Sequence, residues 1–208
     1  MYVHWFIEIC TYICCVNIIL HILISFIMAT TTWTLDPMHS EVQFKVKHLV
    51  ISTVTGNFKK FEGSAVTEGD TFEDAQINFT LDVDSIDTNQ EARDQHLKAE
   101  DFFDAAQYPN IKFESTSFKK ASDDTYKLNG NLTVKNVTKP VTLDVEHGGT
   151  ATDFYGNLKA GFDVTGKINR KEFGLTWEGI TEAGSIVVGE DIKLVISVQF
   201  AKQVEAAA

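Results

Sequence analysis

The chain has 208 residues, with 18 basic and 29 acidic side chains, and its formal net charge is −11 at pH 7. This length allows one domain with a substantial core, and the acidic balance argues against a general affinity for nucleic acids or anionic membrane surfaces, which require basic patches. All three cysteines, Cys10, Cys14 and Cys15, precede Met28, so the rest of the chain has no disulfide, cysteine nucleophile or cysteine metal ligand.

The first 27 residues are mostly apolar and include no Lys or Arg. One helix of this length could span a bilayer, but the segment lacks the basic residues and the cleavage site typical of signals and anchors. Three interpretations stay open: a membrane anchor, a signal peptide, or a start-site artefact with Met28 as the true start. The last predicts a cytoplasmic protein; the others predict a membrane-tethered or periplasmic one, with membrane contact only through this segment. We divide the chain into an extension, 1–28, and a folded domain, 29–208.

After Thr32, apolar and polar residues alternate along short segments that turn residues separate, such as Gly56-Asn57 and Gly148-Gly149. A period of two over four to eight residues predicts strands with one buried face. Further pairing could involve residues 175–180 and 186–188. The eight principal strands expected are 42–46, 58–66, 77–83, 111–114, 126–134, 141–145, 158–164 and 192–200.

One segment, residues 89–108, differs from the alternating pattern because it is rich in helix-forming residues. Asn89 is a plausible N-cap, and Pro109 ends the segment. Its apolar residues suit one or two short helices that lie over a barrel end. The sequence thus predicts a short helical insert between the third and fourth strands.

The predicted fold is all-β, an eight-stranded antiparallel barrel of lipocalin-like type. Closure into a barrel would protect the edges of an eight-stranded antiparallel sheet. An eight-stranded barrel can be filled by side chains or can hold a slender ligand. The inward faces are rich in phenylalanine, which a filled sandwich core would explain equally well, so periodicity alone leaves both interpretations open.

Catalytic and metal-binding motifs are absent from the sequence. It contains no nucleophile-elbow, zinc-protease, P-loop or dinucleotide-binding pattern. The histidines after Met28 (His39, His48, His96 and His147) fall on four different predicted elements without metal-ligand spacing. We therefore predict no metal, no cofactor and no catalytic residue.

Two places could nevertheless contact a ligand. His48 continues the inward parity of Phe44 and Val46, so it is either a hydrogen-bonded core residue or a ligand contact. Arg93 and His96 lie in the helical segment, which could be a salt-bridged lid or could bring these two side chains to a polar or anionic head group. For an enzyme, His48, Arg93 and His96 would be the only plausible acid–base set.

A series of short motifs follows in order along the chain. They are WTLDPMHSEVQF (33–44), VKH (46–48), TGNF (55–58), SIDT (85–88), RDQHL (93–97), DFFD (101–104), YP (108–109), FES (113–115), GNLTVK (130–135), KPV (139–141), NRKEFGL (169–175) and VGED (188–191). This series resembles the YceI-like family of polyisoprenoid-binding proteins. The resemblance runs from Trp33 to about Phe200, and one departure is Asn136, where the family often has glycine. Residues 1–27 have no counterpart in that pattern.

The resemblance implies a non-enzymatic protein whose barrel lumen binds a long isoprenoid or similar amphiphile. Such a protein would act as a carrier or reservoir, in isoprenoid quinone metabolism or stress response, and could form a homodimer. Two alternatives stay open: an enzyme that acts on an isoprenoid lipid, and a structural protein with a filled barrel. The predicted ligand-binding residues are Phe44, Val46, His48, Phe58, Phe79, Leu81, Phe113, Leu132, Phe162, Val164, Arg93 and His96.

Residues 1–27 are expected to be dispensable for folding, because the first alternating segment begins after Trp33 and a barrel needs no group upstream of it. Expression from Met28 should give soluble protein with a cooperative thermal transition, which circular dichroism would record. An insoluble or unfolded product would contradict this expectation, and mass analysis of the native N-terminus would identify the true start.

Overall fold

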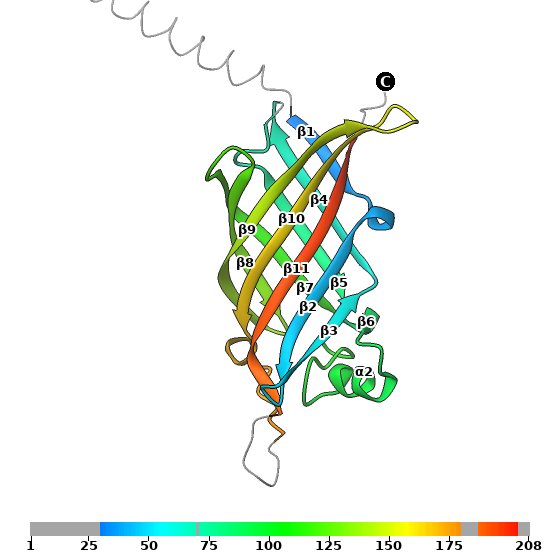
Figure 1. Cartoon of the computed structure of the whole chain (residues 1–208), viewed down its shortest axis with the longest axis vertical. Helices are drawn as coiled ribbons and strands as arrows, with labels where there is room; N and C mark the ends of the chain where they lie inside the picture. Colours follow the sequence, from blue (N-terminus) through cyan, green and yellow to red (C-terminus); the bar gives the residue numbers. More distant parts are fainter. Residues whose placement is uncertain (1–29, 70, 180–186, 204–208) are drawn as a thin grey trace, which may run out of the picture.

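Eleven antiparallel strands form one sheet in the described part of the chain, which comprises residues 30–69, 71–179 and 187–203 of a computed structural model (Figure 1). The predictions for residues 1–28 lie outside this part. The strands are β1 (Thr30–Leu35), β2 (Glu41–His48), β3 (Ser52–Phe58), β4 (Phe61–Glu68), β5 (Gln76–Asp82), β6 (Ile86–Asp87), β7 (Asn110–Lys120), β8 (Thr125–Val134), β9 (Val137–Thr152), β10 (Leu158–Asn169) and β11 (Val188–Lys202).

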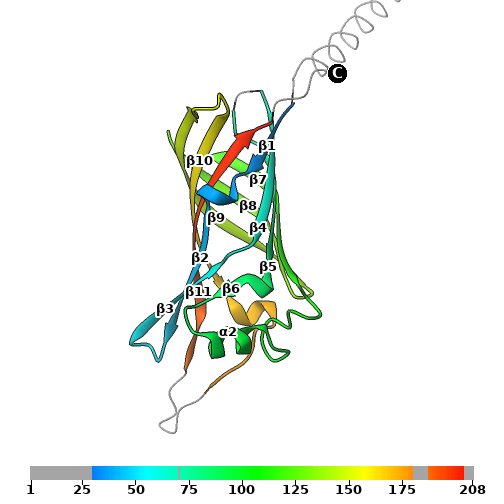
Figure 2. The ribbon, with the colours of Figure 1, turned by 90° about the vertical axis from the view of Figure 1, so that its right-hand side faces the viewer.

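The helical elements are short. The α-helix α2 spans Glu91–Lys98, and the 3-10 helices are η1 (Pro37–His39), η2 (Val83–Ser85) and η3 (Arg170–Phe173). Two views of the ribbon place α2 and η3 at one end of the barrel, opposite the end where β1 begins (Figure 2). We call these the α2 end and the β1 end. Among the described residues, no helix is both long and apolar enough to cross a bilayer.

The sheet closes because β11 pairs with two strands along the same edge. Near its C-terminal end it pairs with β1, where Phe200 lies opposite Leu35, and further back it pairs with β2, where Ile196 lies opposite Val42. β1 and β2 therefore act as one bent strand, with η1 at the bend. β3 and β4 do the same, since β3 pairs with β2 whereas β4 pairs with β1. The predicted eight-stranded antiparallel barrel is confirmed in this form.

Several predicted details are wrong. The helix lies between β6 and β7, not between strands three and four, because the chain forms β1 first, divides the second expected strand at residues 59–60 and adds β6. Neither predicted glycine turn separates two strands, because Gly56-Asn57 lies within β3 and Gly148-Gly149 lies within β9. Gln90, whose side chain accepts a hydrogen bond from the Arg93 amide, caps α2 in place of Asn89. Residues 175–179 form no strand, although Val188 begins β11.

An aromatic cluster fills the lumen at the β1 end. Phe72, from the loop between β4 and β5, lies with its ring centroid 4.9 Å from both Trp33 and Phe162. Phe162 also meets Phe118 and Phe200, each at 6.3 Å. All five side chains are buried. This cluster, the aromatic plug, closes the barrel at that end.

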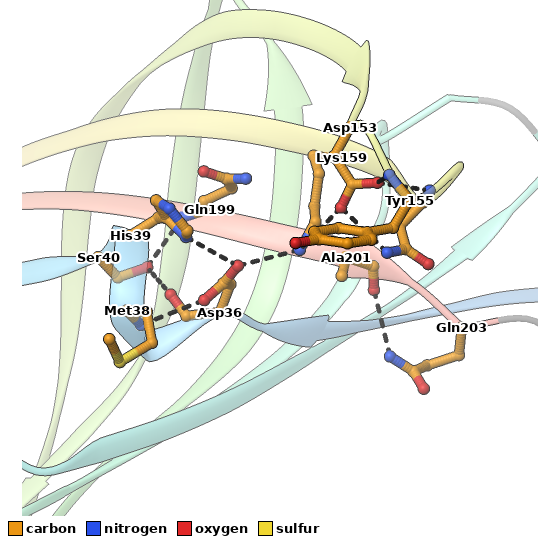
Figure 3. A network of polar contacts seen from close by, with 11 residues as sticks. Asp36, Met38, His39, Ser40, Asp153, Tyr155, Lys159, Gln199, Ala201 and Gln203 are labelled. Carbon is orange, nitrogen blue, oxygen red and sulfur yellow. Dashed lines mark hydrogen bonds and ion pairs between the residues drawn. The ribbon is translucent and has the colours of Figure 1, made fainter.

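A polar network fixes the bend between β1 and β2 (Figure 3). The Asp36 carboxylate pairs with Lys159 of β10 at 2.9 Å and meets His39 Nδ1 at 3.0 Å, and it accepts a hydrogen bond from the Met38 amide. Ser40 Oγ donates to the Asp36 carbonyl and accepts from the Gln199 amide of β11. The network therefore ties the bend to both strands that follow it around the barrel.

The same contacts set the protonation of Asp36. Burial raises the pKa of its carboxyl, but the hydrogen bonds with Lys159 and His39 and the positive charge of Lys159 outweigh burial, so the pKa lies below its ordinary value. A carboxyl whose pKa is lower in the folded chain stabilises the fold above its unfolded pKa of about 4. That stabilisation disappears as the pH falls through the folded pKa.

Asp36→Asn should lower the free energy of unfolding by about 1–3 kcal/mol at neutral pH, because a hydrogen-bonded ion pair is lost in which both side chains are less than a fifth exposed. The difference from the parent should shrink as the pH falls below about 4. Urea unfolding at several pH values would measure it. Asp144→Asn is the control, because its pair with Lys127 is more than half exposed and should contribute less than about 1 kcal/mol. Equal effects of both substitutions would contradict the role of the bend.

Candidate functional site: an apolar lumen between the plug and α2

The barrel encloses a cavity of about 350 Å³, which extends from the aromatic plug to the α2 end. Its volume falls within the range of about 300–1,000 Å³ found for small-ligand sites. The strands around it are long: β11 has 15 residues, and at about 3.3 Å per residue it runs about 50 Å. Lining residues extend along this strand from Val188 to Phe200, so the cavity is elongated rather than round. It is suited to a slender apolar molecule.

The burial of inward residues along β11 shows where the space lies. Val198 and Phe200, near the plug, are buried, whereas Ile192, Leu194 and Ile196 are partly exposed although the same strand parity points them inward. All of them line the cavity. Along β11 the lumen is thus filled toward the β1 end and open toward the α2 end, whereas Leu81, Leu132 and Val134, near the α2 ends of β5 and β8, are buried.

Inward glycines make room for two of the rings that line the cavity. A Cβ atom at Gly56 would collide with the ring of Phe44 on the neighbouring strand, and one at Gly130 would collide with the ring of Phe113. Because glycine has no side chain, each ring can lie flat across its neighbouring strand rather than project into the lumen. This packing lines the wall with aromatic surface while leaving the centre open.

All the residues predicted to bind a ligand line this cavity, although no bound ligand tests the assignment. Strand alternation places most of them on the inner wall: Phe44, Val46 and His48 on β2, Phe58 on β3, Phe79 and Leu81 on β5, Phe113 on β7, Leu132 on β8, and Phe162 and Val164 on β10, with Arg93 and His96 on α2.

The predicted ligand-binding residues do not include the aromatic side chains that cover the α2 end, although the segment 89–108 was expected to lie over a barrel end. Phe102 and Phe103 follow α2, while Trp177 follows η3, and all three line the cavity. His96 meets Trp177 edge-on, with ring centroids 4.9 Å apart, and Phe103 lies 6.4 Å from Phe58 on the barrel wall. These residues lie in irregular segments, where no periodicity marks an inward face. Their aromatic composition was the only available signal.

A hydrogen-bond chain seats α2 on the barrel. Arg93 Nε donates to Thr88 Oγ1 and Arg93 Nη2 donates to the Thr88 carbonyl, both at 2.7 Å. Thr88 in turn donates to Asp94 Oδ1 from its amide, at 2.9 Å, and from its hydroxyl, at 2.5 Å. Thr88 follows β6 directly and is buried. The chain thus connects the first turn of the helix with the wall.

Arg170, also missed, holds the second covering segment. It is 1% exposed and donates to four carbonyl groups, those of Leu175 (2.5 Å), Trp177 (2.9 Å), Gly189 (2.9 Å) and Val188 (3.2 Å). Burial lowers the pKa of Arg170, and the negative charges of Glu178 and Glu190 oppose this only in part. The guanidinium therefore joins residues 175–177 to the start of β11.

The polar residues here form no recognisable catalytic set. His96 Nε2 lies 2.9 Å from Asp101 Oδ2, and Arg93 is bound to Thr88. His48 ends β2 opposite Ser52 and Val188, and its ring makes no hydrogen bond with the described residues. The described part of the chain holds no group of three or more His, Cys, Asp or Glu residues placed to bind a metal. The arrangement can bury an apolar chain and offers hydrogen-bond donors at one end.

Comparison with known proteins agrees with this architecture. The YceI-like domain family matches residues 33–200. The chain belongs to the YceI-like family. Protein YceI of Salmonella newport is 37% identical over 168 residues, which cover 81% of this chain and 84% of that protein.

Two solved structures share the fold. The crystal structure of the Campylobacter jejuni YCEI protein has a TM-score of 0.66 and 34% identity, and the match covers 76% of this chain and 90% of that one. A polyisoprenoid binding domain from Saccharophagus degradans has a TM-score of 0.61 at 15% identity, with coverage of 82% and 98%. At that identity the second likeness concerns the fold alone.

Arg93→Ala should lower the free energy of unfolding by about 1–3 kcal/mol, because it removes two charge-assisted hydrogen bonds to a buried threonine. Lys98→Ala is the control on the same helix: its partner, Asp84, is 73% exposed, so the loss should stay below about 1 kcal/mol. Denaturant unfolding would measure both. If Arg93→Ala is as stable as the parent, Arg93 does not seat the helix.

Proposed function

We propose that this protein binds a long apolar chain of isoprenoid type inside the barrel and releases it chemically unchanged, as a carrier or reservoir. The observation that carries the proposal is the elongated apolar cavity, sealed by the plug at one end and covered by the aromatic residues of the α2 end at the other. The fold shared with the Saccharophagus degradans domain, which is described as polyisoprenoid binding, supports the same choice of ligand.

Apolar burial alone supplies enough free energy. Each buried methylene contributes about 0.8 kcal/mol, so about ten buried carbons contribute roughly 8 kcal/mol before the cost of ordering the chain. A micromolar dissociation constant corresponds to about the same value. A longer isoprenoid chain would offset its own ordering cost by additional contacts with the inner wall, so the lumen needs no strong polar anchor for useful affinity.

The alternative of a filled barrel fits the lumen less well. Close packing would leave inward side chains buried along the whole of each strand. Instead Phe44 and Val46 on β2, like Ile192 and Leu194 on β11, stay partly exposed beside the cavity, whereas Val42, nearer the plug, is buried. The partial exposure along β2 and β11 favours room for a ligand beside these two strands.

The enzyme alternative has little support from the polar groups. Of its acid–base set, Arg93 contacts Thr88 and His96 contacts Asp101, both within the covering segment. His48 remains at the strand end as the one candidate whose ring makes no hydrogen bond within the described ranges. A test for altered lipid therefore concentrates on His48.

Ile196→Trp should abolish retention of lipid and change the free energy of unfolding by less than about 1 kcal/mol, because Ile196 borders open lumen. Ala160→Trp is the matched control: Ala160 is 1% exposed and does not line the cavity, so overpacking should destabilise the fold by about 1–3 kcal/mol or more. Native mass spectrometry after incubation with geranylgeraniol and urea unfolding would measure the two effects.

Two results would contradict the carrier. A parent protein that takes up no lipid, together with strong destabilisation by Ile196→Trp, would favour a filled barrel. Cleaved or oxidised lipid recovered after incubation with the parent, but not with His48→Ala, would favour the enzyme.

A further inference from the structure

The charges along the lumen differ from those of the whole chain. Acidic residues outnumber basic ones 29 to 18, yet the described residues that line the cavity include no Asp or Glu. The same lining includes Lys, Arg and His side chains. Two of these, Lys47 and Lys112, occupy outward positions by strand parity, and Arg170 donates to four carbonyl groups. The remaining basic side chains of the lining are His48, Arg93 and His96, of which His96 contacts Asp101, a residue outside the lining.

Arg93 and His96 face the cavity from the same side of α2. They are three residues apart, and Leu97, which also lines the cavity, follows at the i+4 position from Arg93. Residues with these spacings share one helical face. This face therefore presents one apolar and two nitrogen-bearing side chains to the end of the lumen.

The contacts of Arg93 with Thr88 do not use all the N–H donors of its guanidinium. Its Nε and Nη2 both donate to Thr88, which fixes the plane of the group along one edge. An arginine has five N–H donors, and Nη1 makes no hydrogen bond with any described residue. The carboxylate nearest in sequence, Asp94, accepts two hydrogen bonds from Thr88, and no described carboxylate forms an ion pair with Arg93.

The position of Thr88 places this group beside the inner wall. A Cβ atom at Gly56 would lie 2.8 Å from the Thr88 methyl carbon and would also collide with the Phe44 ring. Thr88, Gly56 and Phe44 are thus in contact where β2 and β3 form the wall, and Arg93 is bound to Thr88 at that point. A chain lying against Phe44 would have its polar end within reach of the α2 face.

We propose that the ligand carries an anionic head group, a phosphate or a carboxylate, and that Arg93 binds it, with His96 beside it on the same helical face. This inference rests on the proposed function, since the apolar chain in the lumen brings the head group to α2. Charge-assisted hydrogen bonds are about twice as strong as neutral ones, and a cationic head group would find no Asp or Glu among the described lining residues. The site thus selects among amphiphiles by charge, while the lumen selects by shape.

The test compares three probes that share one chain: geranylgeranyl phosphate, geranylgeraniol and geranylgeranylamine. Isothermal titration calorimetry with the full chain, stripped of lipid, should give an affinity for the phosphate at least about tenfold higher than that for the alcohol. The amine should bind most weakly of the three. Arg93→Gln should abolish the preference for the phosphate, measured as the ratio of the affinities for the phosphate and the alcohol in the same variant. Arg93→Lys should retain part of the preference. Lys98→Gln, on the same helix but outside the lining, should change nothing.

The outcomes separate the two proposals. Equal affinities for the three probes would overturn the anionic head group and leave the carrier standing, and a preference for phosphate that survives in Arg93→Gln would overturn the assignment to Arg93. Failure of every probe to bind would overturn the carrier itself. If Arg93→Gln does not fold, the parent's order of affinities and Arg93→Lys still decide the question.

Discussion

The pairing of β11 along one edge with both β1 and β2 is the constraint on which the rest of the structure depends. It closes the sheet, so no strand edge is left open at that seam, and it forces the chain to bend between the two strands. The residues at the bend are polar, although the strands on either side of it alternate, because backbone N–H and C=O groups that leave the sheet need other hydrogen-bond partners. The side chains of Asp36 and Ser40 provide them, and the Asp36 carboxylate stays charged because Lys159 and His39 compensate for its burial.

Closure also determines what the inner residues can do. In a flat sheet the phenylalanines of neighbouring strands would pack against a second layer, but in a closed barrel they face each other across a lumen whose width is set by the strands. Phe72 crosses that lumen from a loop and joins Phe162 in the plug. Toward α2, the aromatic residues Phe102, Phe103 and Trp177 of irregular segments line the end of the cavity. The two ends of the cavity thus differ in the segments that close them.

Polar interactions are concentrated on the segments that cover the open end. Thr88 connects α2 to the wall, and Arg170 joins the residues after η3 to β11 through four carbonyl groups. Both arrangements use an arginine bound to oxygen atoms without a buried carboxylate partner, which the fork of guanidinium donors makes feasible. The two arginines nevertheless differ. Arg170 is enclosed by its carbonyl partners, whereas Arg93 keeps donors at the cavity, which is why only Arg93 is a candidate for ligand contact.

The sequence by itself determined the fold class and the inner wall, because strand alternation has a period of two and a buried face must therefore appear as every second residue. Phe44, Phe113 and Val164 could be assigned to the lumen in this way, as could the helical insert. The sequence could not determine the bend at Asp36, the division between β3 and β4, or the place of α2 among the strands. These features depend on which part of β11 each neighbouring strand pairs with.

The sequence also could not reveal Arg170, Phe103 or Trp177 as lining residues, because irregular segments have no periodicity and only tertiary packing decides which of their side chains turn inward. Tertiary packing likewise decides between a filled and an open barrel, because the outcome depends on how far Phe72 and its neighbours reach along the lumen. No local sequence pattern encodes that distance.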